Sequence, residues 1–197
     1  MRRSKRILTS AVVGGLLALA ALPVASATND GPAGGPPVVA GTWEHRHASF
    51  HYDGITSLYS CAGLESNIRA LLQHLGARKD LTVRAYGCPG GYNQPGRTAI
   101  VDVDFYSLAP SADASAANNV QARWTPVTVS ANHPNSIRDG DCELIHEMKD
   151  ILSKNFSLRD LNYRTDCRPG EVNINDFSVK AEILKPLPAT VASAAQG

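Results

Sequence analysis

The feature that most constrains the fold of this chain is an internal repeat marked by tryptophan and cysteine. Each of two tryptophans precedes a cysteine by 18 residues, and a second cysteine follows after 27 residues in one unit and 25 in the other. The markers, in chain order, are Trp43, Cys61, Cys88, Trp124, Cys142 and Cys167. Self-similarity of this kind predicts one supersecondary unit used twice. We assign the repeats to residues 42–110 and 120–186, joined by a loop of small residues.

Both units show the pattern of one helix and three strands. Apolar residues recur at helical spacing after the first cysteine of each unit. These residues are Leu64, Ile68, Leu71, Leu72 and Leu75 in the first unit, and Leu144, Met148, Ile151 and Leu152 in the second. One extended segment precedes each helix and two follow it, so each unit reads β-α-β-β. The sequence therefore predicts an α+β fold: two pseudo-symmetric β-α-β-β repeats forming one mostly antiparallel sheet with two helices on one face.

Four cysteines allow three disulfide pairings, and the repeat selects one of them. In each unit the first cysteine begins the helix and the second ends the next strand, and antiparallel packing brings these two places together. We therefore expect Cys61–Cys88 and Cys142–Cys167, whereas crossed pairings would require interwoven units. Closing a loop of about 25 residues stabilises a fold by about 3–4 kcal/mol in the chain-entropy description.

The N-terminal 27 residues have the pattern of a secretory signal peptide. The basic stretch "MRRSKR" is followed by an apolar run and by "ASA", a small-residue cleavage site. We expect a disordered Gly/Pro-rich lead-in over 28–41, a single α+β domain over 42–186 and a flexible tail over 187–197. A retained membrane span is the weaker interpretation, because Gly14, Gly15 and Pro23 interrupt the apolar run.

The charge of the chain argues against binding to nucleic acid or to anionic lipid, and we also expect no membrane insertion after signal cleavage. The whole sequence has a net charge of +1, but the signal segment holds four of its 19 basic residues and none of its 18 acids. The remaining chain therefore carries about three more negative than positive charges, which attracts neither nucleic acid nor anionic lipid.

A catalytic role for Cys61 is an alternative to its role in a disulfide. The stretch "SLYSCAGLE" places this cysteine where a helix begins, a position that can lower the pKa of a thiol. However, His74 lies near the far end of the same helix, and Cys142 occupies the equivalent place in the second unit. We therefore favour the disulfide, and we interpret Glu65 as an acid that stabilises the helix N-terminus.

Three histidines on one strand raise the possibility of a metal site. His45, His47 and His51 have even spacings and so share one face of a strand, with Asp53 as a candidate fourth ligand. Alignment with the second unit places Ala48 and its even-numbered neighbours on the core side, and the histidines on the solvent side. The alternatives are a solvated strand face and a transition-metal site.

Asp102 and Asp104 alternate with apolar residues and so share the polar side of another strand. A carboxylate pair could serve hydrolysis. The equivalent strand carries Lys180 and Glu182 at these places, and alternating charge is typical of a half-exposed strand. The chain lacks the common nucleophile-elbow, zinc-protease and phosphate-loop motifs. We therefore expect no enzymatic activity and no cofactor.

The polar side of the sheet is the predicted binding surface. Arginine and tyrosine are enriched in interfaces, and a guanidinium suits carboxylates and phosphates. The candidate binding residues are Arg84, Arg164, Tyr86, Tyr106, Asp102 and Asp104. The alternative for the two arginines, which occupy equivalent positions in the repeats, is pairing with the aspartates across the strands.

Several segments resemble a group of small exported proteins of Gram-negative bacteria, of the Xanthomonas and Pseudomonas type, for which no activity is established. The segments are "YDGITSLYSC", "LLQHLGARKDLTVRAYGC", "DCELIHEMKDIL" and "NYRTDC", and the resemblance covers about 43–186 with all four cysteines. It implies a location in the bacterial envelope and carries over no catalytic residue.

Together these features predict a non-enzymatic exported protein, periplasmic or extracellular, that is stabilised by two disulfides. Its role would be that of a binding or accessory module for an envelope protein or a small ligand. The alternative is a histidine-based transition-metal-binding protein of the cell envelope. The sequence does not choose the ligand, the partner or the oligomeric state.

Overall fold

The computed structural model describes residues 36–168, 171–172 and 176–188. The elements of this part, in chain order, are β1 (Val38–Asp53), α1 (Cys61–His74), β2 (Thr82–Tyr86), β3 (Thr98–Pro110), β4 (Val120–Ser130), α2 (Cys142–Asn155), β5 (Leu158–Thr165) and β6 (Phe177–Pro186). We call the elements up to Pro110 the N-terminal half and those from Val120 onward the C-terminal half.

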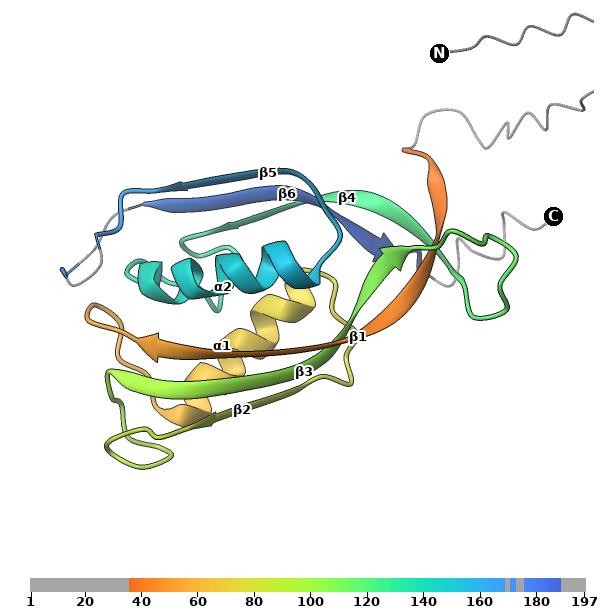
Figure 1. The fold of residues 1–197 in the computed structure, drawn as a ribbon. Coiled ribbons are helices and arrows are strands. Elements are labelled where there is room, and N and C mark those ends of the chain that lie inside the picture. The colour runs from red at the N-terminus through yellow and green to blue at the C-terminus, as the bar shows by residue number, and fades with distance from the viewer. Residues whose placement is uncertain (1–35, 169–170, 173–175, 189–197) are drawn as a thin grey trace, which may run out of the picture. The chain divides into compact units, whose positions relative to one another are not determined.

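The strands form one six-stranded sheet in the order β2-β3-β1-β4-β6-β5, and all neighbouring strands are antiparallel. The two halves are joined through β1 and β4, whose register pairs Val38–Gly41 with residues 120–123. Beyond this short junction the sheet bends, and both helices lie between its two halves (Figure 1). The predicted α+β class, with two helices on one face of an antiparallel sheet, is confirmed.

One hydrophobic core fills the space between the helices and both halves of the sheet. The predicted apolar faces of α1 and α2 are buried in it. They pack with inward-pointing residues of the strands, such as Val103 of β3 and Val179 of β6. Burying both helices against a single bent sheet removes more apolar surface from water than either half could remove alone.

Both predicted disulfides are present. Cys61 is joined to Cys88 and Cys142 to Cys167, with a Cα–Cα distance of 5.9 Å in each bridge. Each bridge ties the first residue of a helix to the segment that follows the next strand. All four cysteines are therefore used, and the alternative of a catalytic Cys61 thiolate is wrong.

The N-terminus of α1 is capped by Ser60, because the Gly63 amide donates a hydrogen bond to its hydroxyl over 3.1 Å. The expectation that Glu65 serves this end of the helix is wrong. Its carboxylate accepts hydrogen bonds from the Ala85 amide (2.8 Å) and the Tyr92 hydroxyl (2.6 Å). Glu65 thus ties α1 to the end of β2 and to the loop after Cys88.

The residue before α2 is Asp141, which is buried and makes longer-range contacts than Ser60. Its carboxylate accepts hydrogen bonds from the hydroxyls of Ser57 (2.8 Å) and Tyr59 (2.6 Å) and from the amide of Arg138 (2.7 Å). Burial and the bond to Asp141 raise the pKa of the Tyr59 phenol, so the phenol stays a donor. Because Ser57 and Tyr59 precede α1, this carboxylate fastens the N-terminal half to the C-terminal half.

The predicted boundaries need one correction. Strand β1 begins at Val38, so the last four residues of the expected lead-in, 38–41, belong to the sheet. They pair with β4 because backbone groups at the centre of a sheet need partners. The signal segment, most of the lead-in and the tail beyond 188 lie outside the described residues. Within the described part, no helix combines the length and apolar character needed to cross a membrane.

Candidate functional site

The outer face of the sheet, which is the face opposite the helices, is divided into two surfaces. The sequence pattern places Arg84 and Arg164 on one polar side, and both do point to this side. However, the bend at the β1–β4 junction turns the outer faces of the two halves away from each other (Figure 1). The candidate binding residues therefore do not form a single site.

The N-terminal outer face carries most of the candidates, and they neutralise one another. Asp102 of β3 lies opposite Arg84 of β2 and opposite Ser49 of β1. Hydrogen bonds from Ser49 and from the Tyr86 hydroxyl, followed by the nearby charges of His47 and Arg84, lower the pKa of the Asp102 carboxyl. This carboxylate is a satisfied acceptor, and its charge offsets that of Arg84.

Two of the three histidines gather around one carboxylate. His47 Nδ1 lies 3.1 Å and His45 Nε2 lies 3.6 Å from the same oxygen of Asp104. His51 lies four residues beyond His47, about 13 Å along the strand, and faces Ile100. Among the described residues no group of three or more His, Cys, Asp or Glu side chains could hold a metal ion. The three-histidine metal site is therefore not proposed further.

Tyr106, another candidate, is covered by its neighbours. The Arg78 guanidinium lies 3.8 Å from the centre of its ring, and the His45 ring lies 5.1 Å away between centroids. Arg78 is in turn paired with Asp80, with both bonds at 2.6 Å. The ring therefore serves as a platform for Arg78.

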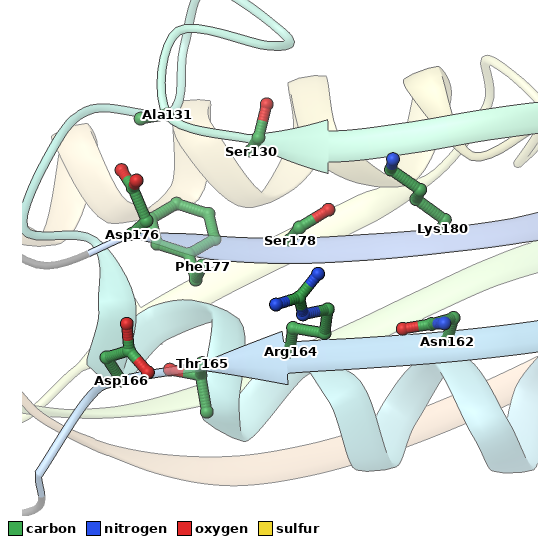
Figure 2. Close-up of a pocket in the computed structure, with 10 residues that line it drawn as sticks. All are labelled: Ser130, Ala131, Asn162, Arg164, Thr165, Asp166, Asp176, Phe177, Ser178 and Lys180. Atoms are coloured by element: carbon green, nitrogen blue, oxygen red, sulfur yellow. The ribbon is translucent and has the colours of Figure 1, made fainter.

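The C-terminal outer face contains an open hollow of about 560 Å³ at the ends of β4, β5 and β6 (Figure 2). Its lining residues are Ser130, Ala131, Asn162, Arg164, Thr165, Asp166, Asp176, Phe177, Ser178 and Lys180. Hydroxyl, amide and charged groups predominate among them. We call this site the C-terminal hollow.

Three strands place the donor groups of the hollow in two rows. In the first row Ser178 of β6 lies between Ser130 of β4 and Arg164 of β5. In the second row Lys180 of β6 lies opposite Asn162 of β5. Successive rows come from alternate residues, so all these side chains point outward on one face. The rows bring together two hydroxyls, an amide, a guanidinium and an ammonium group.

Arg164 and Lys180 differ from Arg84 in what lies opposite them. Arg164 faces a serine and Lys180 faces an asparagine, whereas Arg84 faces an aspartate. Within the described part of the chain, Arg84, Arg164 and Lys180 all lack an ion pair, but the charge of Arg84 lies close enough to Asp102 to help lower the pKa of that carboxyl. The side chains of Arg164 and Lys180 are exposed, so their donors are available to a solute.

Of the candidate binding residues, the structure brings only Arg164 to the hollow. Sequence reasoning placed Asn162 and Lys180 on the same polar face without assigning them to a site, and it missed Ser130, Ser178, Asp166 and Asp176. A sequence signal for these residues was present, because the alternation that turns Lys180 outward also turns Ser178 and Asp176 outward. What alternation cannot show is which strand lies next to which.

Comparison of the chain with protein-family models, with curated proteins and with solved structures found no match. The resemblance to exported proteins of Gram-negative bacteria stays a prediction, and the functional inference rests on the geometry of the outer face.

Proposed function

We propose that this chain is an exported, non-catalytic binding protein that holds a small anionic group, a carboxylate or a phosphate, in the C-terminal hollow. The observation that carries the proposal is the pair Arg164 and Lys180, two cations on adjacent strands that form no ion pair among the described residues. Ser130, Ser178 and Asn162 add neutral donors beside them. Charge-assisted bonds to such oxygens are stronger than neutral ones.

Binding is favoured over catalysis by the state of the chemically useful groups. The cysteines are used in disulfides, which removes thiol chemistry. A general acid needs a pKa near the working pH, whereas that of Asp102 is lowered by the Ser49 and Tyr86 hydrogen bonds. A stable scaffold with an open donor-rich hollow suits reversible binding.

Export is supported by two observations of different kinds. Disulfides persist in oxidising compartments outside the cytoplasm. The N-terminal 27 residues have the order of basic, apolar and small-residue segments that secretion requires. The proposal leaves the choice between periplasm and extracellular medium to fractionation of the producing cell.

The proposal includes a duplicated architecture in which each half is one β-α-β-β unit. The order of elements is the same in both halves, and the order of strands reads outward as β1-β3-β2 in one and β4-β6-β5 in the other. Each helix also begins at a disulfide-bonded cysteine. In this description the N-terminal half provides matched control positions for the C-terminal half.

Titration of the ¹⁵N-labelled protein with acetate and with inorganic phosphate tests the site. We expect saturable chemical-shift changes at 128–131, 162–166 and 176–180, with a Kd of about tens of millimolar or weaker, because exposed ion pairs contribute only about 0.2–1 kcal/mol each. Arg164→Gln and Lys180→Gln should each weaken binding, and the matched Arg84→Gln variant should not. If neither anion shifts these resonances, or if Arg84→Gln has the same effect as Arg164→Gln, the proposed function is wrong.

A further inference from the structure

The charged groups of the C-terminal hollow are divided between two ends. Arg164 and Lys180 provide the positive end, while Asp176 and Asp166 lie at the other end of the same strands (Figure 2). Asp176 precedes Ser178 by two residues and Asp166 follows Arg164 by two, and the Asp166 amide donates to the Asp176 carbonyl over 3.3 Å. The two aspartates therefore form the next row of the same outer face.

Strand geometry sets the separation of the two ends. Each residue advances about 3.3 Å along a strand, so the aspartate row lies about 7 Å from the row of Ser178 and Arg164. It lies about 13 Å from the row of Lys180 and Asn162. The negative and positive ends are thus close enough for one small molecule to reach both, and neither Arg164 nor Lys180 forms an ion pair with Asp176.

Ser130 and Ser178 lie in the same row as Arg164, between the aspartate row and the row of Lys180. They lie opposite each other on β4 and β6, and both line the hollow. A hydroxyl is both a donor and an acceptor, so the pair can serve the N–H and the C=O of a neutral amide. The order along the hollow is therefore the two aspartates, then the hydroxyls with Arg164, then Lys180 with Asn162.

This arrangement disfavours simple anions and simple cations. A dianion such as phosphate gains from Arg164 and Lys180 but meets the repulsion of Asp176 across the same hollow. A monovalent cation is attracted by Asp176 but repelled by Arg164 and Lys180. With two acidic and two basic side chains lining it, the hollow is formally neutral, and a ligand with separated opposite charges matches both ends.

We infer that the ligand of the C-terminal hollow is zwitterionic, with a carboxylate on Arg164 and Lys180 and an ammonium group on Asp176, joined through an amide. A short peptide with free termini has this chemistry. The inference rests on the proposed function, because it specifies the ligand of the same anion-binding site. Asp176 is the residue that distinguishes it from binding of an anion alone.

Three probes that share the diglycine backbone separate the contribution of the ligand's carboxylate from that of its ammonium group in an NMR titration of the full protein. Diglycine carries both charges, N-acetyldiglycine carries only the carboxylate, and diglycine amide carries only the ammonium group. We expect diglycine to bind at least about threefold more tightly than either blocked form, which is the size of effect that one exposed ion pair produces. The shifts should lie in 128–131, 162–166 and 176–180.

The variant Asp176→Asn removes the charge of Asp176 from the negative end of the hollow. It should weaken diglycine by about threefold and leave N-acetyldiglycine unchanged or slightly tighter. Arg164→Gln should weaken both of these probes, and the matched Arg84→Gln variant should weaken neither. Amide spectra and thermal unfolding confirm that each variant is folded, which these exposed positions permit.

The outcomes distinguish the two proposals. Equal affinity for diglycine and N-acetyldiglycine, with both weakened by Arg164→Gln, would overturn the zwitterionic ligand and keep the anion site. No shift with any probe would overturn both. Tighter diglycine binding that Asp176→Asn does not reduce would place the ammonium group elsewhere, and it too would overturn the inference.

Discussion

The two halves of this protein have the same order of helices and strands, but they differ in the side chains that lie opposite the arginines of their outer faces. In the N-terminal half Arg84 lies opposite Asp102, whose carboxylate also accepts hydrogen bonds from Ser49 and Tyr86. In the C-terminal half Arg164 lies opposite Ser178, which carries no charge. The first surface is satisfied by its own side chains and the second is not. The side chain across the strand pair therefore decides whether an arginine supports the sheet or remains available to a ligand.

The starts of the two helices show a second difference. Ser60 caps α1 through a local bond from Gly63, whereas Asp141 before α2 holds Ser57 and Tyr59 of the other half. A local cap stabilises one helix end, and a buried carboxylate with distant donors couples two regions. The halves are thus alike in secondary structure and unlike in what their equivalent positions contact.

Removal of a disulfide should have the largest effect on the free energy of unfolding, and the effect should be similar in the two halves. The bridges close loops of 27 and 25 residues, so the double variants Cys61→Ala/Cys88→Ala and Cys142→Ala/Cys167→Ala should each lose about 3.5 kcal/mol of unfolding free energy. Urea denaturation measures this loss. A cost near zero for one pair only would show that the halves are not stabilised in the same way.

The helix starts should respond unequally. Asp141→Ala leaves two partly buried hydroxyls and the Arg138 amide without their acceptor and should cost about 3 kcal/mol. Ser60→Ala removes one local bond and should cost about 1 kcal/mol. Asp141→Asn, which keeps one acceptor oxygen, should lie between them. Equal costs in chemical denaturation would contradict the coupling role of Asp141.

Exchange of one side chain should give the C-terminal surface the character of the N-terminal one. Ser178→Asp places a carboxylate opposite Arg164, as Asp102 lies opposite Arg84. We expect acetate binding to weaken at least about threefold, because the new acid neutralises the cation and repels the anion. The unfolding free energy should change by no more than about 0.5 kcal/mol, as for most surface substitutions. Unchanged acetate affinity would show that Arg164 does not bind the acetate carboxylate.

The smallest effect concerns pH and a contact between the halves. His74 of α1 donates from Nε2 to the Thr128 carbonyl of β4 over 3.0 Å. Burial, together with the nearby charge of Lys185 and the neighbouring His133, lowers the pKa of its imidazole. The unfolded chain therefore takes up the proton first. The stability present above pH 6.5 should fall as the pH drops through the lower folded value.

His74→Gln keeps a donor for Thr128 and removes the titration. Its unfolding free energy should decline less between pH 7 and pH 5 than that of the parent protein. The exposed His146→Gln on α2 is the matched control and should follow the parent. If both variants lose as much unfolding free energy between pH 7 and pH 5 as the parent protein, the titration of His74 does not affect the contact between the halves.

The regular parts of the fold were accessible to sequence reasoning because they follow local periodicity. Leu64, Ile68 and Leu71 of α1 recur at helical spacing, and the alternation around Val103 marks an inner and an outer side of β3. The disulfide pairing followed from the similar spacing of the cysteines in the two units, 27 and 25 residues. The prediction for Glu65 was wrong because it considered only neighbouring residues of the chain. Glu65 was assigned to the N-terminus of its own helix, but its carboxylate accepts a hydrogen bond from the Ala85 amide, twenty residues away.

The candidate site was only partly accessible. Alternation placed Arg84, Asp102, Arg164 and Lys180 on the polar side, but it could not show that Asp102 faces Arg84 while Ser178 faces Arg164. Such pairings depend on strand order and register, which arise from contacts between residues far apart in the chain. The three-histidine site failed for a related reason, because four residues of extended strand separate His51 from His47.

The sequence by itself determined the kinds of element, their inner and outer faces, and the two disulfides, because each depends on spacing within the chain. The tertiary structure decided that the outer face is two surfaces and that, among the described residues, Arg84 lies opposite an acid whereas Arg164 and Lys180 lie opposite uncharged residues. The bend at the β1–β4 junction, where Val38–Gly41 pair with residues 120–123, separates the surfaces. The side chain across each strand pair then decides whether a charge is neutralised within the fold or presented to a ligand.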